Sequence, residues 1–212
     1  CSNTYRMIVL SSLEKVFPHQ EPVFSPECCR FNGLYGEILT YQAACCLKGL
    51  RKEKLKVRVF SALKDSIRIR QVLHVPSSYP AHEKRDSNYL SHTPGLYPDL
   101  LRNLENNSLV LVPGRWQSLW IDVTIPGIIP GGLYPVTVSL TDSQDREVVS
   151  VTVGIEVIPI PLPAQELYHT EWFHGDCLAD YYKVPVFSEE HWNILGRFIS
   201  LYGKRGMNMI LT

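Results

Sequence analysis

The feature that most constrains the fold of this chain is a strict two-residue alternation of apolar and polar side chains. The alternation recurs in four segments, 54–63, 118–125, 133–140 and 147–157. In the second segment, Leu119 and Ile121 alternate with Trp120 and Asp122. Successive side chains of a β-strand point to opposite faces, so each segment predicts a strand with one face in a core and the other in water.

Three more segments, at about 5–13, 35–46 and 67–75, also have the composition of strands. Turns rich in proline and glycine, such as 124–135, separate the strands, and no helical pattern intervenes. Strands connected in this way pair antiparallel and bury one face of each sheet against another sheet. Residues 1–160 therefore predict a mainly β domain, an antiparallel β-sandwich.

The segment from Pro76 to Leu111 does not alternate and is rich in Pro, Tyr, His, Asn and Asp. A loop of this length in a compact domain usually has a function or is disordered, and its tyrosines favour packing against the domain. Two interpretations remain. The segment is either a lid that covers a sheet edge or docks another domain, or a contributor to a ligand cleft. No nucleophile in it has a base at a suitable spacing, which favours the lid.

The charges of the chain are balanced, with 21 Lys and Arg against 21 Asp and Glu. Such a chain has no overall field that would attract nucleic acid or an anionic membrane. Its apolar runs also fall short of the roughly 18 residues that a membrane-spanning helix needs. We therefore expect neither nucleic acid nor a membrane among the partners.

The cysteines form two adjacent pairs and two single residues: Cys28 with Cys29, Cys45 with Cys46, Cys1 and Cys177. Zinc ribbons separate paired cysteines by about two to four residues, whereas adjacent cysteines on a strand point to opposite faces. We therefore expect reduced thiols, no zinc and no cofactor. Free thiols favour a reducing compartment such as the cytoplasm. Cys1 would also suit a lipid-anchored, secreted protein, and one residue does not decide between the two.

The pattern changes after the proline-rich linker at 161–166. The run "HTEWFH" (169–174) has the composition of a strand, and "MNMILT" (207–212) that of a strand buried on both faces. Between them, residues 188–203 predict an amphipathic helix with Ser188 as its N-cap.

The apolar face of that helix consists of Trp192, Leu195, Phe198, Ile199 and Tyr202. Strand, helix and buried strand form one β-α-β unit, which is too small to cover both of its own faces. Residues 167–212 therefore predict the truncated start of a larger α/β domain, for which a (β/α)8 barrel is the natural candidate.

Several motifs resemble those of one enzyme family. They are "SSLEKVFP" (11–18), "TPGLYPDLL" (93–101), and "TEWFHGDCLADYY", "VFSEEHW" and "MNMILT" within 170–212. The chain resembles glycoside hydrolase family 123, whose catalytic part was long catalogued as domain of unknown function 4091. The resemblance covers nearly the whole chain, and its most specific part follows residue 170. It implies an N-terminal β-sandwich and then the first unit of a catalytic barrel.

The resemblance also implies an activity of the β-N-acetylgalactosaminidase type on glycans that carry 2-acetamido sugars. In the family the acetamido oxygen of the substrate attacks the anomeric carbon, while an Asp–Glu pair orients that group and protonates the leaving oxygen. This pair lies on a later barrel strand, and nothing in 1–212 matches it. We therefore predict the non-catalytic, inactive N-terminal portion of a glycoside hydrolase, whose glycan substrate binds through the rest of the barrel.

Active sites of such barrels lie at the carboxyl ends of the strands. The residues that this rule places at the rim are Trp172, His174, Asp176, Asp180 and Tyr181. Trp172 or Tyr181 would stack on a sugar, and the three polar residues would bond its hydroxyls. In the other interpretation Trp172 is core and the polar groups cap a helix or fix the loop. The two are balanced for His174 and Asp176, while core is favoured for Trp172.

A metal site is a further hypothesis for this stretch. His169, His174 and Asp176 lie close together in sequence, but their spacing matches no standard metal-binding signature. We therefore expect no metal.

Two other functions remain open. One is a free-standing carbohydrate-binding sandwich that acts through exposed Trp116 and Trp120, and the other is a scaffold for protein contacts. The β-α-β unit discriminates against both, because neither function needs it. An apolar helix face without cover favours self-association, so we also expect a homodimer built through residues 166–212.

Overall fold

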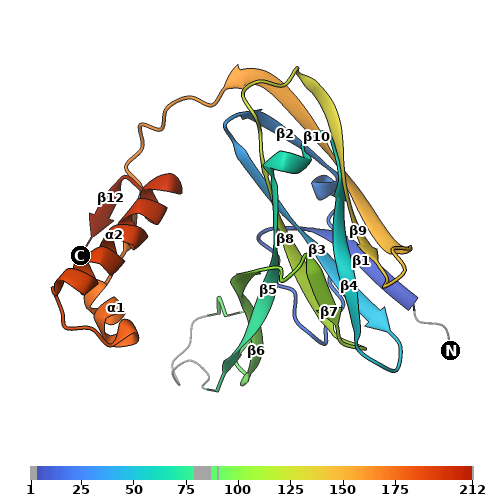
Figure 1. Cartoon of the computed structure of the whole chain (residues 1–212), viewed down its shortest axis with the longest axis horizontal. Coiled ribbons are helices and arrows are strands. Elements are labelled where there is room, and N and C mark those ends of the chain that lie inside the picture. Colours follow the sequence, from blue (N-terminus) through green and yellow to red (C-terminus); the bar gives the residue numbers. More distant parts are fainter. Residues whose placement is uncertain (1–3, 79–86, 90, 212) are drawn as a thin grey trace. The chain divides into compact units, whose positions relative to one another are not determined.

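The computed structural model describes residues 4–78, 87–89 and 91–211. The chain forms two compact units, Cys1–Leu162 and Pro163–Thr212, each with secondary structure of its own (Figure 1). The first unit contains two five-stranded sheets, and the second contains a two-stranded sheet with two helices.

In the first unit, sheet A has the order β1 (Thr4–Ser11), β3 (Ile38–Lys48), β8 (Trp116–Thr124), β5 (Ile67–Ser77) and β6 (Gly95–Asn103). Sheet B has the order β2 (Arg30–Tyr35), β10 (Glu147–Pro161), β9 (Gly132–Thr141), β4 (Glu53–Phe60) and β7 (Ser108–Leu111). Two short 3₁₀ helices, η1 (Pro26–Cys29) and η2 (Lys64–Ser66), lie between strands. Neighbouring strands are antiparallel except β2 and β10, which run parallel and correct the prediction of a wholly antiparallel sandwich.

The inner faces of the two sheets share one hydrophobic core, which gives the first unit a sandwich-like arrangement. Sheet A contributes Leu119 and Ile121, and sheet B contributes Val138 and Ile155, all fully buried. These are the apolar positions of the alternating segments. The sequence pattern therefore predicted the buried face of each strand correctly.

The outer face of sheet A is more buried than the alternation predicts. Asp122, expected in water, is only 6% exposed. Its Oδ1 accepts hydrogen bonds from Thr40 (2.9 Å) and Trp120 Nε1 (3.0 Å), and Arg70 Nη2 donates to its Oδ2 at 2.5 Å. These donors replace the water that the carboxylate loses, which is how a buried charge is tolerated here.

The segment expected to be a long loop, Pro76–Leu111, contains two strands. β6 pairs with β5 from Gly95 opposite Ser77 to Asn103 opposite Arg70, and β7 pairs with β4. As an edge strand, β6 is largely exposed on both faces, so its sequence lacks the alternation of a half-buried strand. The part of the predicted lid at 79–86 and at 90 lies outside the described residues.

The cysteine pairs differ from each other in structure. Cys45 and Cys46 lie on β3 and enter two different hydrophobic clusters, as strand alternation predicts. Cys28 and Cys29 instead lie in η1, so strand alternation does not apply to them; Cys28 is buried and Cys29 is exposed. Burial raises the pKa of the Cys45 thiol well above its ordinary value.

The second unit contains β11 (Thr170–Trp172), α1 (Gly175–Tyr182), α2 (Glu189–Lys204) and β12 (Met209–Leu211). β11 and β12 pair in parallel, with Glu171 opposite Ile210. The helix predicted at 188–203 is confirmed as α2, and the hydroxyl of its N-cap Ser188 accepts a hydrogen bond from the His191 amide. Helix α1 occupies residues predicted as loop. It is short and has no side-chain cap, so its sequence carries little helical signal.

No helix among the described residues is long and apolar enough to cross a membrane.

Candidate functional site

A pocket of about 520 Å³ opens in the second unit, directly after the carboxyl end of β11. Its walls come from the β11–α1 junction, the loop before α2, one face of α2, and β12. The lining residues are Phe173, His174, Gly175, Asp176, Val186, Phe187, Trp192, Leu195, Ile199 and Ile210. The pocket is mostly apolar and aromatic, with two polar side chains at one end, a composition common in binding sites for organic ligands. Those two polar side chains are His174 and Asp176, both predicted site residues.

Packing of Phe173, the residue directly after β11, against α2 fixes one wall of this pocket. Phe173 is 8% exposed and contacts Tyr202 edge-on, with ring centroids 5.3 Å apart, and Phe198 at 6.4 Å. Gly175 lies so close to α2 that a Cβ on it would be 3.0 Å from Leu195 Cδ2. A glycine at the start of α1 therefore lets the helix approach α2, and this approach sets the position of the neighbouring His174 and Asp176.

His191 connects two other walls of the pocket, the loop before α2 and the start of α1. Its ring is fully buried, Nδ1 accepts a hydrogen bond from the Phe187 amide at 2.9 Å, and Nε2 lies 2.8 Å from the Gly175 carbonyl oxygen. Because Nδ1 accepts, Nε2 carries the proton and donates to Gly175. The ring thus fastens the loop before α2 to the start of α1. Sequence analysis did not select His191, although its place three residues after the N-cap, beside an aromatic pair, is a usable signal.

Phe187, which lines the pocket, is held in a strained backbone conformation. Its φ is 61°, in the left-handed region that bulky residues rarely adopt. Its ring stacks on Trp192 at 5.6 Å and 24°, yet Phe187 is 68% exposed and Trp192 56% exposed. Strained residues cluster at functional sites, where the surrounding structure holds them in place. The hydrogen bond to His191 and the stacking on Trp192 do so here.

The other predicted site residues lie outside the pocket. Trp172 is 78% exposed, so the preference for a core position was wrong; its neighbour Phe173 takes that position. As successive strand residues point to opposite faces, Trp172 lies on the side of β11 away from Phe173 and α2. Asp180 and Tyr181 are exposed on α1, where the Tyr181 ring contacts Tyr182 at 5.1 Å.

The three residues considered as metal ligands do not converge. His169 Nε2 lies 3.1 Å from Glu171 Oε1, whereas His174 and Asp176 line the pocket. Within 4–78, 87–89 and 91–211, no group of three or more His, Cys, Asp or Glu side chains is close enough to hold an ion.

The tryptophans proposed for a carbohydrate-binding sandwich are not available as a stacking surface. Trp116 is 5% exposed, packs with Leu10 and Cys46, and lies beneath the Arg6 guanidinium at 5.3 Å. Trp120 is half-buried, and its Nε1 donates to Asp122. The expectation of an exposed ring was wrong for Trp116, which packs with Val16 after β1 and whose amide donates to the Pro18 carbonyl oxygen, and Trp120 is only partly accessible.

Residues 172–212, which include the whole pocket, match the model of the glycoside hydrolase 123 catalytic domain. The resemblance to glycoside hydrolase family 123 that the motifs predicted is thereby confirmed. The structure is similar to a family 123 glycoside hydrolase from Clostridium perfringens whose structural analysis concerns glycolipid glycan hydrolysis, with a TM-score of 0.72 and 17% sequence identity. The similarity covers 98% of this chain and 37% of that protein, so the two share a fold over little more than a third of the larger molecule.

Two further solved structures have much lower TM-scores. An N-terminal domain of PorA has a TM-score of 0.34 at 8% identity, over 73% of this chain and 99% of that one. A β-glucosidase from Listeria innocua has a TM-score of 0.33 at 14% identity, over 76% of this chain and 17% of that one. No curated protein sequence matches the chain.

Proposed function

We propose that this chain is the N-terminal, non-catalytic portion of a glycoside hydrolase that cleaves glycans carrying 2-acetamido sugars. The observation that carries the proposal is the parallel β11–β12 pair with its connecting helices, in the segment that matches the family 123 catalytic domain. The first unit would serve as an accessory β-sandwich. The second would be the first β-α-β unit of a (β/α)8 barrel.

A parallel strand pair supports the barrel interpretation for a physical reason. Parallel strands need a crossover, here supplied by α1 and α2, and they occur in sheets that are covered on both faces. In the second unit the helices cover the face that bears Phe173, while Trp172, on the opposite face, is exposed. In a closed barrel that opposite face would be the interior, with Trp172 at its catalytic end.

The site residues would then divide into two roles. His174 and Asp176 supply a donor and an acceptor at the carboxyl end of β11, suited to sugar hydroxyls, and Asp176 also lies in the first turn of α1, where the helix dipole favours its negative charge. Trp172 lies outside this pocket, on the opposite face of β11, so it would stack on a pyranose ring only from the interior of a closed barrel. Asp180 and Tyr181 lie outside the pocket and take no part.

The reaction itself would need groups that this chain does not provide. In substrate-assisted hydrolysis the acetamido oxygen forms a bond to the anomeric carbon as the glycosidic bond breaks, and the departing oxygen takes a proton from a carboxylic acid. A second carboxylate must orient the acetamido group. Asp176 is a single carboxylate beside an imidazole, so the chain binds without turnover.

The test is made on the purified chain with a nitrophenyl N-acetyl-β-galactosaminide and with free N-acetylgalactosamine. We expect no release of nitrophenol, but saturation-transfer NMR signals from N-acetylgalactosamine. Asp176→Asn and His174→Ala should each weaken this binding by about fivefold to tenfold, the value of one lost hydrogen bond.

Asp180→Asn is the matched control, because it changes a carboxylate on the same helix outside the pocket and should leave binding unchanged. Turnover that persists after rigorous purification, or that Asp176→Asn abolishes, would refute the non-catalytic assignment. Equal binding by the Asp176 and Asp180 variants would refute the assignment of the pocket.

A further inference from the structure

The two sheets of the first unit lose their outer strands at the same place. β7 pairs with β4 only over Glu53–Lys56, which leaves Val57–Phe60 without a strand on that side among the described residues. β6 pairs with β5 only from Arg70 onward, so Ile67–Ile69 likewise have no strand on their outer side among the described residues. The turn 104–107 crosses between the shortened edges.

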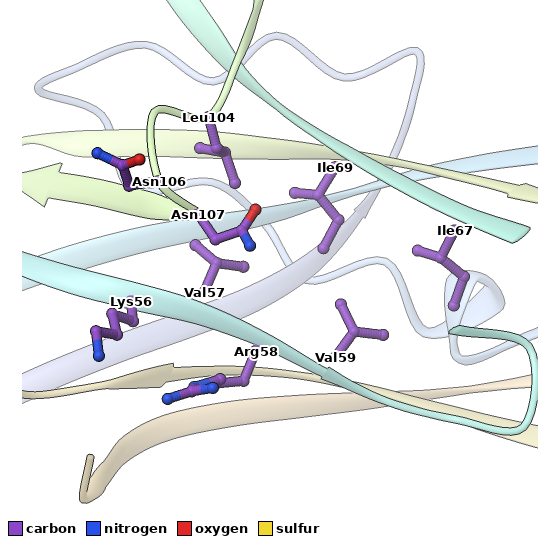
Figure 2. Close-up of a pocket in the computed structure, with 9 residues that line it drawn as sticks. All are labelled: Lys56, Val57, Arg58, Val59, Ile67, Ile69, Leu104, Asn106 and Asn107. Carbon is purple, nitrogen blue, oxygen red and sulfur yellow. The ribbon is translucent and has the colours of Figure 1, made fainter. Parts of the chain in front are cut away.

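A pocket of about 440 Å³ opens between these two shortened edges (Figure 2). Its lining residues are Lys56, Val57, Arg58, Val59, Ile67, Ile69, Leu104, Asn106 and Asn107. Figure 2 shows Val57 and Val59 pointing from β4 toward the side of Ile69 and Leu104, while Arg58 points to the opposite side of the strand. A hollow with five aliphatic side chains in its lining, and with mostly polar groups at its accessible surface, therefore adjoins a strand edge that no other described strand covers.

The backbone of β4 offers hydrogen bonds at this edge. The Val57 amide donates to the Asn107 carbonyl oxygen at 2.7 Å, and Asn106 and Asn107 both have a φ of 50° in this tight turn. Within a strand, N–H and C=O groups alternate between the two edges with period two. The Val59 N–H and C=O and the Val57 C=O therefore face the same open side. They are three groups that an added strand could bond.

The charges along this edge select the partner. Lys56 Nζ (3.4 Å) and Arg58 Nη2 (2.7 Å) share one carboxylate oxygen of Asp145, so two cations are matched by a single anion. Both side chains remain about half exposed. Opposite charges on neighbouring strands attract and like charges repel. An added strand with carboxylates beside Lys56 and Arg58 is therefore favoured.

The same charges exclude a second copy of the chain. Antiparallel pairing of two β4 edges centred on Arg58 would place the cations of one copy against those of the other. Charged residues on exposed edges commonly prevent self-pairing in this way. The charges on this edge thus disfavour pairing with a second copy of the chain and favour pairing with an acidic segment.

We propose that the edge Val57–Phe60 of β4 binds an extended acidic peptide by strand addition. Alternate aliphatic side chains of the peptide enter the hollow beside Val59 and Ile69, and the intervening carboxylates lie beside Lys56 and Arg58. Peptides that extend a sheet in this manner gain affinity from main-chain hydrogen bonds and specificity from alternate side chains.

The probe is a short fluorescein-labelled peptide of alternating glutamate and valine, and its control has lysine in place of glutamate. Fluorescence anisotropy on the whole chain should show the acidic peptide binding about tenfold more tightly than the basic one. Arg58→Glu should reverse this preference, and Arg58→Gln should reduce it without adding a repulsive charge. Arg30→Glu is the matched control and should leave the preference unchanged. Arg30 lies on β2, at the other edge of the same sheet, where it pairs with Glu156 of β10.

The binding mode has its own measurement. Amide chemical shifts should move at Val57–Phe60 and Ile67–Ile69. Peptides N-methylated on one alternating set of amides should lose binding, and those methylated on the other set should keep it. No binding by the unmodified chain, equal affinity for the acidic and basic peptides, or shifts at the edges formed by β1, β2 or β6 would overturn the proposal.

Discussion

The two units of this protein differ in how completely each buries its own apolar side chains. In the first, a large set of apolar side chains, among them Leu119, Ile121 and Leu140, is fully buried between two sheets. In the second, the buried apolar residues within 163–210 are Phe173, Ala179, Ile194 and Leu195, while Trp172, Trp192 and Ile199 are exposed. The difference teaches that paired strands and a well-capped helix such as α2 do not by themselves complete a domain. The second unit needs cover that its own residues do not supply.

The largest expected effect comes from separating the units. A chain that ends at Leu162 should remain monomeric and unfold in one cooperative transition, because its core is complete without the rest. The chain 1–212 should associate through residues 166–212, since burying each exposed aromatic or aliphatic side chain is worth about 1.5–3 kcal/mol. Light scattering on both chains makes the measurement. If both are monomeric and equally soluble, the second unit needs no partner and the contrast fails.

A second prediction compares one core residue from each environment. Leu119→Ala should lower the free energy of unfolding of the first unit by about 2–5 kcal/mol, because it opens a cavity among fully buried neighbours. Ile199→Ala, at a side chain that is 44% exposed in the single chain, should change stability by less than about 1 kcal/mol when measured at a concentration low enough to keep the chain monomeric. Urea titrations followed by tryptophan fluorescence on the chain that ends at Leu162 report the first unit. Helical circular dichroism on the chain 1–212 reports the second unit, which contains both α-helices. A similar loss for both variants would mean that Ile199 is covered in solution.

The smallest expected effect depends on pH. Burial, and to a lesser degree the neighbouring Cys46, raises the pKa of Cys45, so the folded chain keeps this proton while the unfolded chain loses it above its ordinary pKa of about 8.5. The unfolded state then binds fewer protons, and stability is full below that pH and falls as pH rises, by up to about 1.4 kcal/mol per pH unit. Tyr41, also raised by burial, adds to this only above about pH 10.

Urea titrations between about pH 8 and 10 test this linkage. Cys45→Ala should reduce the slope, and Cys28 and Cys46, whose pKa values burial also raises, should sustain the remainder. Cys29→Ala should leave the slope unchanged, because Cys29 is exposed. An unchanged slope in the Cys45 variant would show that the thiol is not the group responsible.

The same contrast explains what could be predicted from sequence. Alternation revealed the inward faces of β4, β8, β9 and β10, because half-buried strands must alternate. It missed β6, which is exposed on both faces, and the burial of Asp122, which depends on Arg70 and Thr40 from other strands. Periodicity carries no information on such neighbours.

In the second unit the sequence identified β11, α2 and β12, and it placed His174 and Asp176 near one another. It missed α1, which is too short to show a period, and the contribution of Phe187, Trp192 and His191 to the pocket. Trp192 had been assigned to a buried helix face. The pocket arises because that face lacks cover, which depends on tertiary structure.

The parallel pairing of β2 with β10 has a consequence for how the first unit forms. Arg30 pairs with Gly154, and most of the strands of the first unit lie between these two residues in the sequence. β10 also pairs with β9 on its other side. Contacts so distant along the chain close slowly, since the entropy of the intervening loop is lost before the contact repays it. During synthesis, the edge of β2 therefore stays unpaired until β10, the last strand of the sandwich, has left the ribosome. Residues 163–212 are synthesised directly after β10, so we expect them to emerge before β10 has paired with β2.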